Sequence, residues 1–257
     1  MLMVNSDPLH QFQIHPLFGD LNWDVGGFNL APTNSALFIG AAVLLIIGVL
    51  AVGTSKLATV PGRMQSLTEI WYSFVNGIVK DVNHEDGKPF VPLVFSLFSL
   101  IFFANIIGMW PFFFTSTSHI AVTGALALFT IGLVIVIGVW KNGFKFLKIF
   151  VPSGVPLYIL WFVAIIEVFS FLSRPLSLAM RLFANMLAGH IALKIFAGFI
   201  PTLAIGLGAI GVAMGAFLVL PMVVGITALE FLVAFLQAYV FAILTCVYLN
   251  DALHPGH

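Results

Sequence analysis

Charged side chains are scarce in this sequence of 257 residues: they make up 8% of it, whereas hydrophobic residues make up 61%. The mean hydropathy is +1.12. An ordinary soluble domain carries about a quarter charged residues, so this chain has too few polar side chains to cover a water-facing surface. No polar block is long enough for a second domain, and we expect residues 1–257 to form a single membrane domain. The formal net charge is zero, which gives no indication of a nucleic-acid partner.

Cysteine is nearly absent from the sequence, and several common catalytic motifs are missing altogether. Cys246 is the only cysteine, which excludes an intramolecular disulfide and a metal site built from several cysteines. There is no GxxxxGK[ST], HExxH or GxSxG motif, so the sequence offers no machinery for nucleotide hydrolysis or proteolysis. The histidines outside position 190 show no ligand spacing, and we expect neither a metal nor a cofactor.

Long apolar runs are what the sequence has in abundance. A bilayer core about 30 Å thick needs about 20 helical residues. Residues 36–54 fit a first span and residues 90–141 a helical hairpin. The polar segment 1–35 lacks the basic start of a cleavable signal peptide. Residues 61–88 repeat apolar side chains at helical spacing against polar ones, which predicts an amphipathic helix lying along the membrane surface.

The last two apolar segments, 156–199 and 204–250, are too long for upright spans. Each would measure roughly 65 to 70 Å as a helix at about 1.5 Å per residue. Each must therefore tilt steeply or divide into two spans, and the residues alone do not decide between these alternatives. We expect an all-α integral membrane protein with about five membrane helices and a turn at residues 200–203.

Basic residues indicate the orientation in the membrane. Lysine and arginine gather in the loops at 56–88 and 141–148, and such loops face the cytoplasm or the mitochondrial matrix. We call this the inner side. The loop 115–119 and the turn 200–203 contain no lysine or arginine, so we expect them on the opposite, outer side.

The segment 156–199 carries ionisable side chains within an otherwise apolar sequence. Such side chains cost about 3 kcal/mol each on insertion scales and by default mark a functional path. Successive steps of seven residues place three of them within about 40° of one another on one helix face, and polar residues four positions before and after Arg181 extend this stripe. The residues of the stripe are Glu167, Arg174, Ser177, Arg181 and Asn185.

His190 and Glu230 extend this polar chemistry. At helical pitch His190 falls about 180° away from Arg181, so the two should face different surroundings. Glu230 is the sole charged residue of the segment 204–250, with Gln237 seven residues later on the same face. A cation on the neighbouring long helix is its natural partner.

Plainer interpretations of these charges stay open at this point. The alternative for Arg174 and Lys194 is that their long side chains simply extend their charged ends to the two membrane interfaces. The alternative for Arg181 is a purely structural role, as one partner of a buried ion pair with Glu167 or Glu230.

Two strings of the sequence closely resemble subunit a of F-type ATP synthases. They are SRPLSLAMRLFANMLAGH at 173–190 and ALEFLVAFLQAYVFAILTCVYLND at 228–251. Supporting similarity runs through DPLHQFQIHPL, GRMQSLTEIWYSFV and FFANIIGMWPFFFTSTSH, so the resemblance covers nearly the whole chain.

The resemblance implies a stator subunit that lets protons cross the membrane and thereby turns a c-ring. Arg181 matches the family's essential arginine, which faces the carboxylates of that ring. The positions that match the proton path toward the outer side are Asn185, His190, Glu230 and Gln237. Glu167 and Ser177 match polar positions near the opposite half-channel. The resemblance also implies that the last two segments form a steeply tilted hairpin.

Partners, location and ion follow from the same resemblance. It implies peripheral-stalk b subunits, the c-ring and the remainder of the synthase as partners, with the nucleotide chemistry on other subunits. Some bacterial relatives have an acidic residue in place of His190 and a histidine in place of Glu230. The reversed pair here resembles the alphaproteobacterial and mitochondrial branch, so we expect a bacterial inner membrane, with the mitochondrial inner membrane as the alternative. Histidine and glutamate relay protons but form a poor sodium cage, which favours the proton as coupling ion.

Two other functions were weighed. A secondary transporter with a substrate site among the same charges would usually show internal repeats, and the sequence has none. A membrane scaffold without transport would leave the polar stripe unexplained.

The distribution of basic residues leads to a topology prediction. Cysteines placed singly at Lys80 and Lys145 in a Cys246→Ser background should react with membrane-impermeant reagents from the inner side, and cysteines at His119 and Pro201 from the outer side. Labelling of intact and inverted vesicles measures this directly. A cysteine at position 80 that reacts only from the outer side would contradict the orientation.

Overall fold

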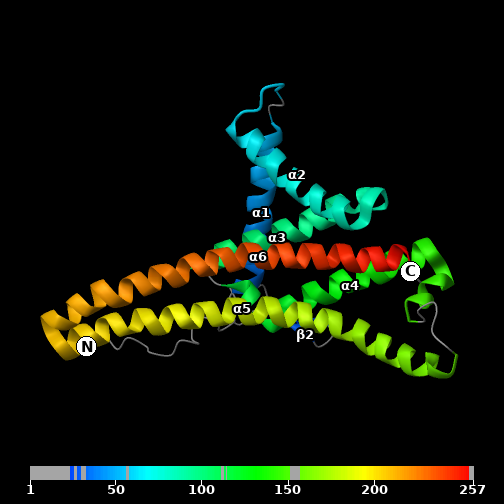
Figure 1. Cartoon of the computed structure of the whole chain (residues 1–257). Helices are drawn as coiled ribbons and strands as arrows, with labels where there is room; N and C mark the ends of the chain where they lie inside the picture. Colours follow the sequence, from blue (N-terminus) through cyan, green and yellow to red (C-terminus); the bar gives the residue numbers. More distant parts are fainter. Residues whose placement is uncertain are drawn as a thin grey trace.

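The computed structural model describes residues 24–25, 28–29, 33–55, 58–110, 113, 115–150 and 157–254, and this part of the chain is almost entirely helical (Figure 1). Most of the polar segment 1–35 lies outside the described residues. Within it, strand β1 (Asp24–Val25) pairs antiparallel with strand β2 (Phe28–Asn29).

Three helices have the length of a single membrane crossing. They are α1 (Asn34–Thr54), α3 (Val91–Gly108) and α4 (Ile120–Asn142). With 18 to 23 residues each, they measure roughly 27 to 35 Å at about 1.5 Å per residue, close to the thickness of a bilayer core. The side chain of Thr33 caps α1 by accepting a hydrogen bond from the N–H of Ala36 at 3.4 Å.

Helix α2 (Arg63–Asn83) and the 3₁₀ helix η2 (His84–Phe90) connect α1 to α3. One face of α2 buries Val75 and Val79 against the other helices, while Lys80 remains exposed. Between α3 and α4 lies the short 3₁₀ helix η3 (Ser116–Ser118), and α4 is followed by the 3₁₀ helix η4 (Gly143–Phe150).

The rest of the chain forms a long helical hairpin. It comprises α5 (Leu157–Met214), the π-helix η5 (Gly215–Val219) and α6 (Leu220–Leu253). The chain reverses within α5 at Gly208, which has φ 56° and ψ −131°. The expected turn at 200–203 is therefore wrong by several residues.

The position of the reversal follows from backbone chemistry. A positive φ is readily adopted by glycine, whereas the proline ring of Pro201 holds φ near −65°, a value within the helical range that cannot reverse the chain. Thr202, the next residue, donates through Oγ1 to the carbonyl of Gly198 at 2.8 Å, so its hydroxyl is satisfied within the helix. The two limbs then approach so closely that a side chain at Gly211 would collide with the Leu203 carbonyl.

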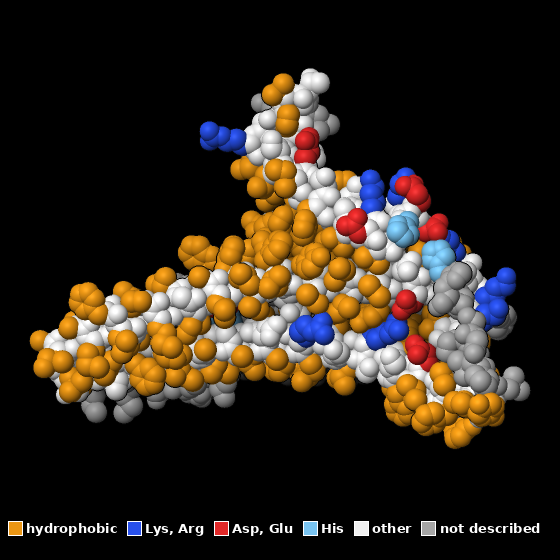
Figure 2. All heavy atoms as spheres, in the orientation of Figure 1, with side chains coloured by type: hydrophobic (Ala, Val, Ile, Leu, Met, Phe, Trp, Pro, Cys, Tyr) orange, Lys and Arg blue, Asp and Glu red, His pale blue; other side chains and the backbone are white. Residues whose placement is uncertain are grey.

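The two limbs of the hairpin lie side by side and cross α1 at a steep angle (Figure 1). The limb before Gly208 would measure roughly 75 Å at about 1.5 Å per residue, more than twice the bilayer core. Large apolar side chains are exposed around the turn, as the left end of Figure 2 shows. An all-α membrane protein with a tilted terminal hairpin is thus confirmed.

Helix α6 occupies the centre and contacts α2, α3, α4 and α5. An asparagine from each of the three shorter neighbours donates through Nδ2 to an α6 carbonyl. The bonds are Asn83 to Cys246 at 3.0 Å, Asn105 to Ala234 at 3.4 Å and Asn142 to Ala252 at 2.8 Å. Together these bonds oppose both sliding of α6 along its axis and rotation about it.

Candidate functional site

The polar side chains of the hairpin form three contact pairs between α5 and α6. Since the helices run antiparallel, residue numbers rise along α5 while they fall along α6. From the open end of the hairpin toward its turn, the pairs are Arg174–Asp251, Asn185–Gln237 and His190–Glu230. From the first pair to the third, α5 advances 16 residues, roughly 24 Å at about 1.5 Å per residue.

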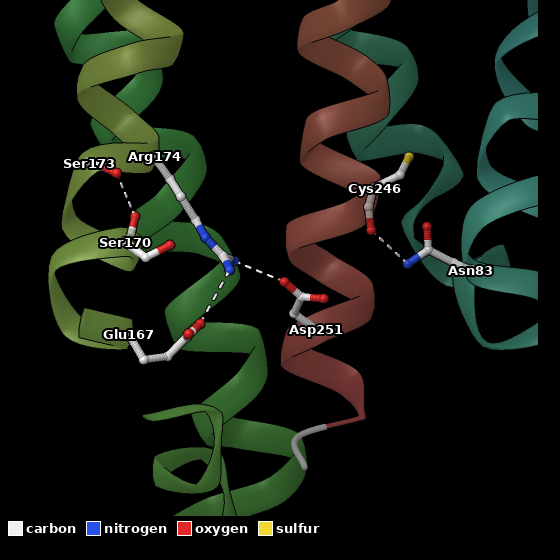
Figure 3. A network of polar contacts seen from close by, with 7 residues as sticks. All are labelled: Asn83, Glu167, Ser170, Ser173, Arg174, Cys246 and Asp251. Carbon is white, nitrogen blue, oxygen red and sulfur yellow. Dashed lines mark hydrogen bonds and ion pairs between the residues drawn. The ribbon is translucent and has the colours of Figure 1, made fainter. Parts of the chain in front are cut away.

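Arg174 forms the pair nearest the open end (Figure 3). Its Nη1 lies 2.9 Å from Oδ2 of Asp251, and its Nη2 lies 3.8 Å from Oε1 of Glu167. The guanidinium also stands over the rings of Tyr248 and Phe171, at 5.0 and 5.6 Å from their centroids. Arg174 is therefore paired with side chains of both α5 and α6.

The open end of the hairpin lies beside the loops that the basic residues assign to the inner side. Nε2 of His254, just after α6, lies 3.1 Å from Oδ2 of Asp86 in η2. Asn142, the last residue of α4, donates to the carbonyls of Ala252 and Leu253. Most of the ionisable side chains in Figure 2 accordingly lie on this side of the molecule, and none is seen at the turn.

The middle pair is a hydrogen bond between two amides. Nδ2 of Asn185 donates to Oε1 of Gln237 at 3.0 Å. Gln237 is buried, whereas Asn185 is exposed on α5. The pair thus connects the surface of α5 to the interior of the hairpin.

The third pair is buried and lies beside η3. Nε2 of His190 is 3.6 Å from Oε1 of Glu230 and 3.0 Å from Oγ1 of Thr115. His190 is 8% exposed and Glu230 is 3% exposed. Space for the carboxylate comes from Gly189, where an added Cβ would lie 2.8 Å from Oε1 of Glu230. An acid and a base therefore share an enclosed site next to the loop expected on the outer side.

The His119 side chain adds no positive charge to that loop near neutral pH. It precedes α4 outside the membrane-spanning segments, and burial lowers the pKa of its imidazole from the usual 6.5. The ring is therefore neutral at pH 7.

Arg181 lies on α5 between the first and third pairs. It is seven residues from Arg174 and nine from His190, roughly 10 and 14 Å along the helix. Its side chain is exposed, as is that of Ser177 one turn earlier. Among the described residues Arg181 makes no ion pair, so the alternative of a structural pair with Glu167 or Glu230 is not found.

The structure thus separates the predicted stripe into different roles. Glu167 contacts Arg174 and Asn185 contacts α6, whereas Ser177 and Arg181 are exposed on α5. Within the part of the chain that the structure describes, no three His, Cys, Asp or Glu side chains come together as a metal site.

Two contact residues were missed at the level of sequence. Asp251 stands at the end of an apolar run, where a carboxylate is ordinarily expected to be solvated and not paired with another helix. Thr115 is a small hydroxyl residue in a loop with no periodicity. A helical projection of α5 places its own side chains, but it cannot tell which residue of another element faces them.

Residues 36–250 match the family of the ATP synthase A chain. The chain belongs to this family. Over nearly its whole length it is similar to proteins named ATP synthase subunit a. Identity is 56% over 254 residues with that of Chelativorans sp., covering 98% of this chain and 99% of the relative. It is 55% over 253 residues with that of Rhizobium johnstonii, covering 98% and 99%. It is 53% over 262 residues with that of Maricaulis maris, covering 99% and 100%.

Family membership confirms the resemblance stated from the two strings. As an A chain with several long apolar helices, this is a multi-pass membrane protein and part of an ATP synthase complex.

The Arg174–Asp251 contact should stabilise this A chain measurably. We expect Arg174→Gln and Asp251→Asn each to lower thermal stability, and the double variant to lose less than the sum of the two. The pair is partly buried, so its coupling free energy should be about 1 kcal/mol, at the upper end for accessible ion pairs. Thermal unfolding of the purified complex in detergent gives all four values.

A matched control is the exposed ion pair between Lys88 and Glu85. Its double-mutant cycle, with glutamine at either or both positions, should give a coupling near zero because water screens both charges. Strictly additive losses at Arg174 and Asp251 would show that their contact does not stabilise the hairpin.

Proposed function

We propose that this chain is the proton-translocating stator subunit of a rotary F-type ATP synthase. The observation that carries the proposal is the position of Arg181, an exposed cation on α5 between two polar groups that lie at different levels of the hairpin. A guanidinium at membrane depth is costly unless a counter-charge or water compensates it. Since this chain supplies no such charge among its described residues, the counter-charge belongs to a partner.

The partner that fits is a ring of c subunits bearing carboxylates within the membrane. Each carboxylate passing Arg181 is stabilised in its ionised form and gives up its proton. The guanidinium suits this role because it stays protonated in proteins and offers several donors in a fixed plane. After passing Arg181, the carboxylate takes up a new proton and turns into lipid as a neutral acid.

Two half-channels supply and remove these protons. The path toward the outer side runs along Gln237, Asn185, Glu230 and His190, beside η3. The path toward the inner side runs near Ser177, Glu167 and the Arg174–Asp251 pair. Arg181 lies between the two sets, where a fixed positive charge bars protons from crossing directly.

The free energy released by proton flow is sufficient to drive ATP synthesis. Each proton that crosses a potential of 100 mV releases about 2.3 kcal/mol. Several such steps in one turn of the ring supply the free energy that the catalytic subunits use to make ATP. This chain contributes the gate, and the nucleotide chemistry belongs to other subunits.

We place the chain in a bacterial inner membrane, with the mitochondrial inner membrane as the alternative. The support is that the relatives named above are alphaproteobacterial proteins matched over nearly their full length. The peripheral-stalk b subunits would hold this chain, as one domain of 257 residues, against the turning ring.

Arg181→Lys should assemble but fail to couple proton flow to ATP hydrolysis. Lysine lacks the planar donor fork and gives up its proton more readily when desolvated. We expect ATP-driven proton pumping in inverted vesicles to fall to background.

The same exchange at the exposed Arg63, at the start of α2, is the matched control and should pump normally. Normal pumping by Arg181→Lys would exclude the proposed role.

His190 and Glu230 should act as one acid–base unit. Replacing either alone by alanine leaves its buried partner unpaired and should slow proton flux while assembly is preserved. The double exchange His190→Glu with Glu230→His restores one acid and one base in contact, so it should recover more flux than either single exchange.

Proton flux through the membrane sector is compared for the two single exchanges and the double. If the losses simply add, the two residues do not work as a pair.

A further inference from the structure

Thr115 holds His190 from a loop outside the hairpin. It lies just before η3 and is 5% exposed. Its Oγ1 donates to the carbonyl of Gly108 at 3.0 Å and lies 3.0 Å from Nε2 of His190. One hydroxyl thus connects the end of α3 to the buried acid–base pair.

The direction of the second hydrogen bond follows from counting hydrogens. A threonine hydroxyl has one hydrogen to donate and two lone pairs that accept. The Gly108 carbonyl can only accept, so the hydroxyl hydrogen is directed to it. Toward His190 the Thr115 oxygen is then an acceptor, and Nε2 must carry a hydrogen.

The Gly108 carbonyl is a demanding acceptor. Gly108 is the last residue of α3, and the last four carbonyls of a helix have no partner within the helix. The fit is close, because an added Cβ at Gly108 would lie 2.8 Å from Cγ2 of Thr115 and 3.1 Å from its Cα. The loop itself is held by Ser118, whose Oγ donates to the Thr115 carbonyl at 2.6 Å.

The same nitrogen of His190 faces Glu230. Oε1 of Glu230 lies 3.6 Å from Nε2, beyond the usual range of a hydrogen bond, whereas Thr115 is within it. The hydrogen on Nε2 is therefore held by Thr115 while the carboxylate stands close by.

We propose that Thr115 is a positioning residue for proton transfer: its hydroxyl, oriented by the Gly108 carbonyl, keeps a hydrogen on Nε2 of His190 beside Glu230. This inference rests on the proposed function of the chain. When a protonated His190 ring passes the Nε2 proton to Oε1 of Glu230, the ring becomes neutral and the carboxylate becomes a carboxylic acid. The hydroxyl then turns its hydrogen from Gly108 to the lone pair on Nε2, so the ring keeps its orientation for the next proton.

The test compares Thr115→Val with Thr115→Ser in the whole ATP synthase. Valine keeps the branched shape without the hydroxyl, and serine keeps the hydroxyl without the methyl. We expect the valine variant to lower proton flux in inverted vesicles about fivefold, the effect of one lost hydrogen bond of ordinary strength. The serine variant should retain most of the flux.

A second background tests whether Thr115 acts through His190. In a His190→Gln chain the valine and serine variants should have equal flux. A valine variant as fast as the unchanged protein, or an equal loss in both backgrounds, would overturn the inference. If the valine variant fails to assemble, Thr115→Cys replaces it, because cysteine resembles serine in shape but is a much weaker hydrogen-bond partner.

Arg181→Lys measured in parallel separates this inference from the proposed function. If Arg181→Lys fails to pump while Thr115→Val is normal, only the role of Thr115 falls. If Arg181→Lys pumps normally, the proposed function itself falls.

Discussion

Charged groups at membrane depth are costly unless they are paired, and the antiparallel contact of α5 with α6 determines how this cost is met. Arg174 and Asp251 neutralise each other at the open end, while His190 and Glu230 face each other farther along. A change in the register of the two helices would separate both pairs together. Arg181 makes no ion pair among the described residues, and it places an exposed positive charge on the surface of α5.

The register itself depends on the shorter helices. Three asparagines, one each from α2, α3 and α4, bind carbonyls spread along α6. The α3–α4 link also reaches α5 through Thr115 and His190. Helices α2, α3 and α4 therefore serve as a frame that holds α6, and with it the long hairpin, in place.

Much of this arrangement could be predicted from sequence. Apolar run lengths predicted the helices, and steps of seven predicted that Glu167 and Arg174 share a face. The turn was misplaced because the boundary between two apolar segments was used to locate it, whereas the reversal depends on the positive φ that Gly208 allows. Thr115 and Asp251 could not be found, since pairing between distant segments depends on packing and leaves no periodic signal.

The central claim is that Arg181 separates two proton half-channels, one of which runs through Glu230. Passive proton flux in vesicles carrying the whole complex, without nucleotide, tests it most directly. Arg181→Ala should make these vesicles leak protons, and adding Glu230→Ala should close most of that leak because the outer half-channel is then interrupted. A tight Arg181→Ala variant, or a leak that Glu230→Ala leaves unchanged, would contradict this account.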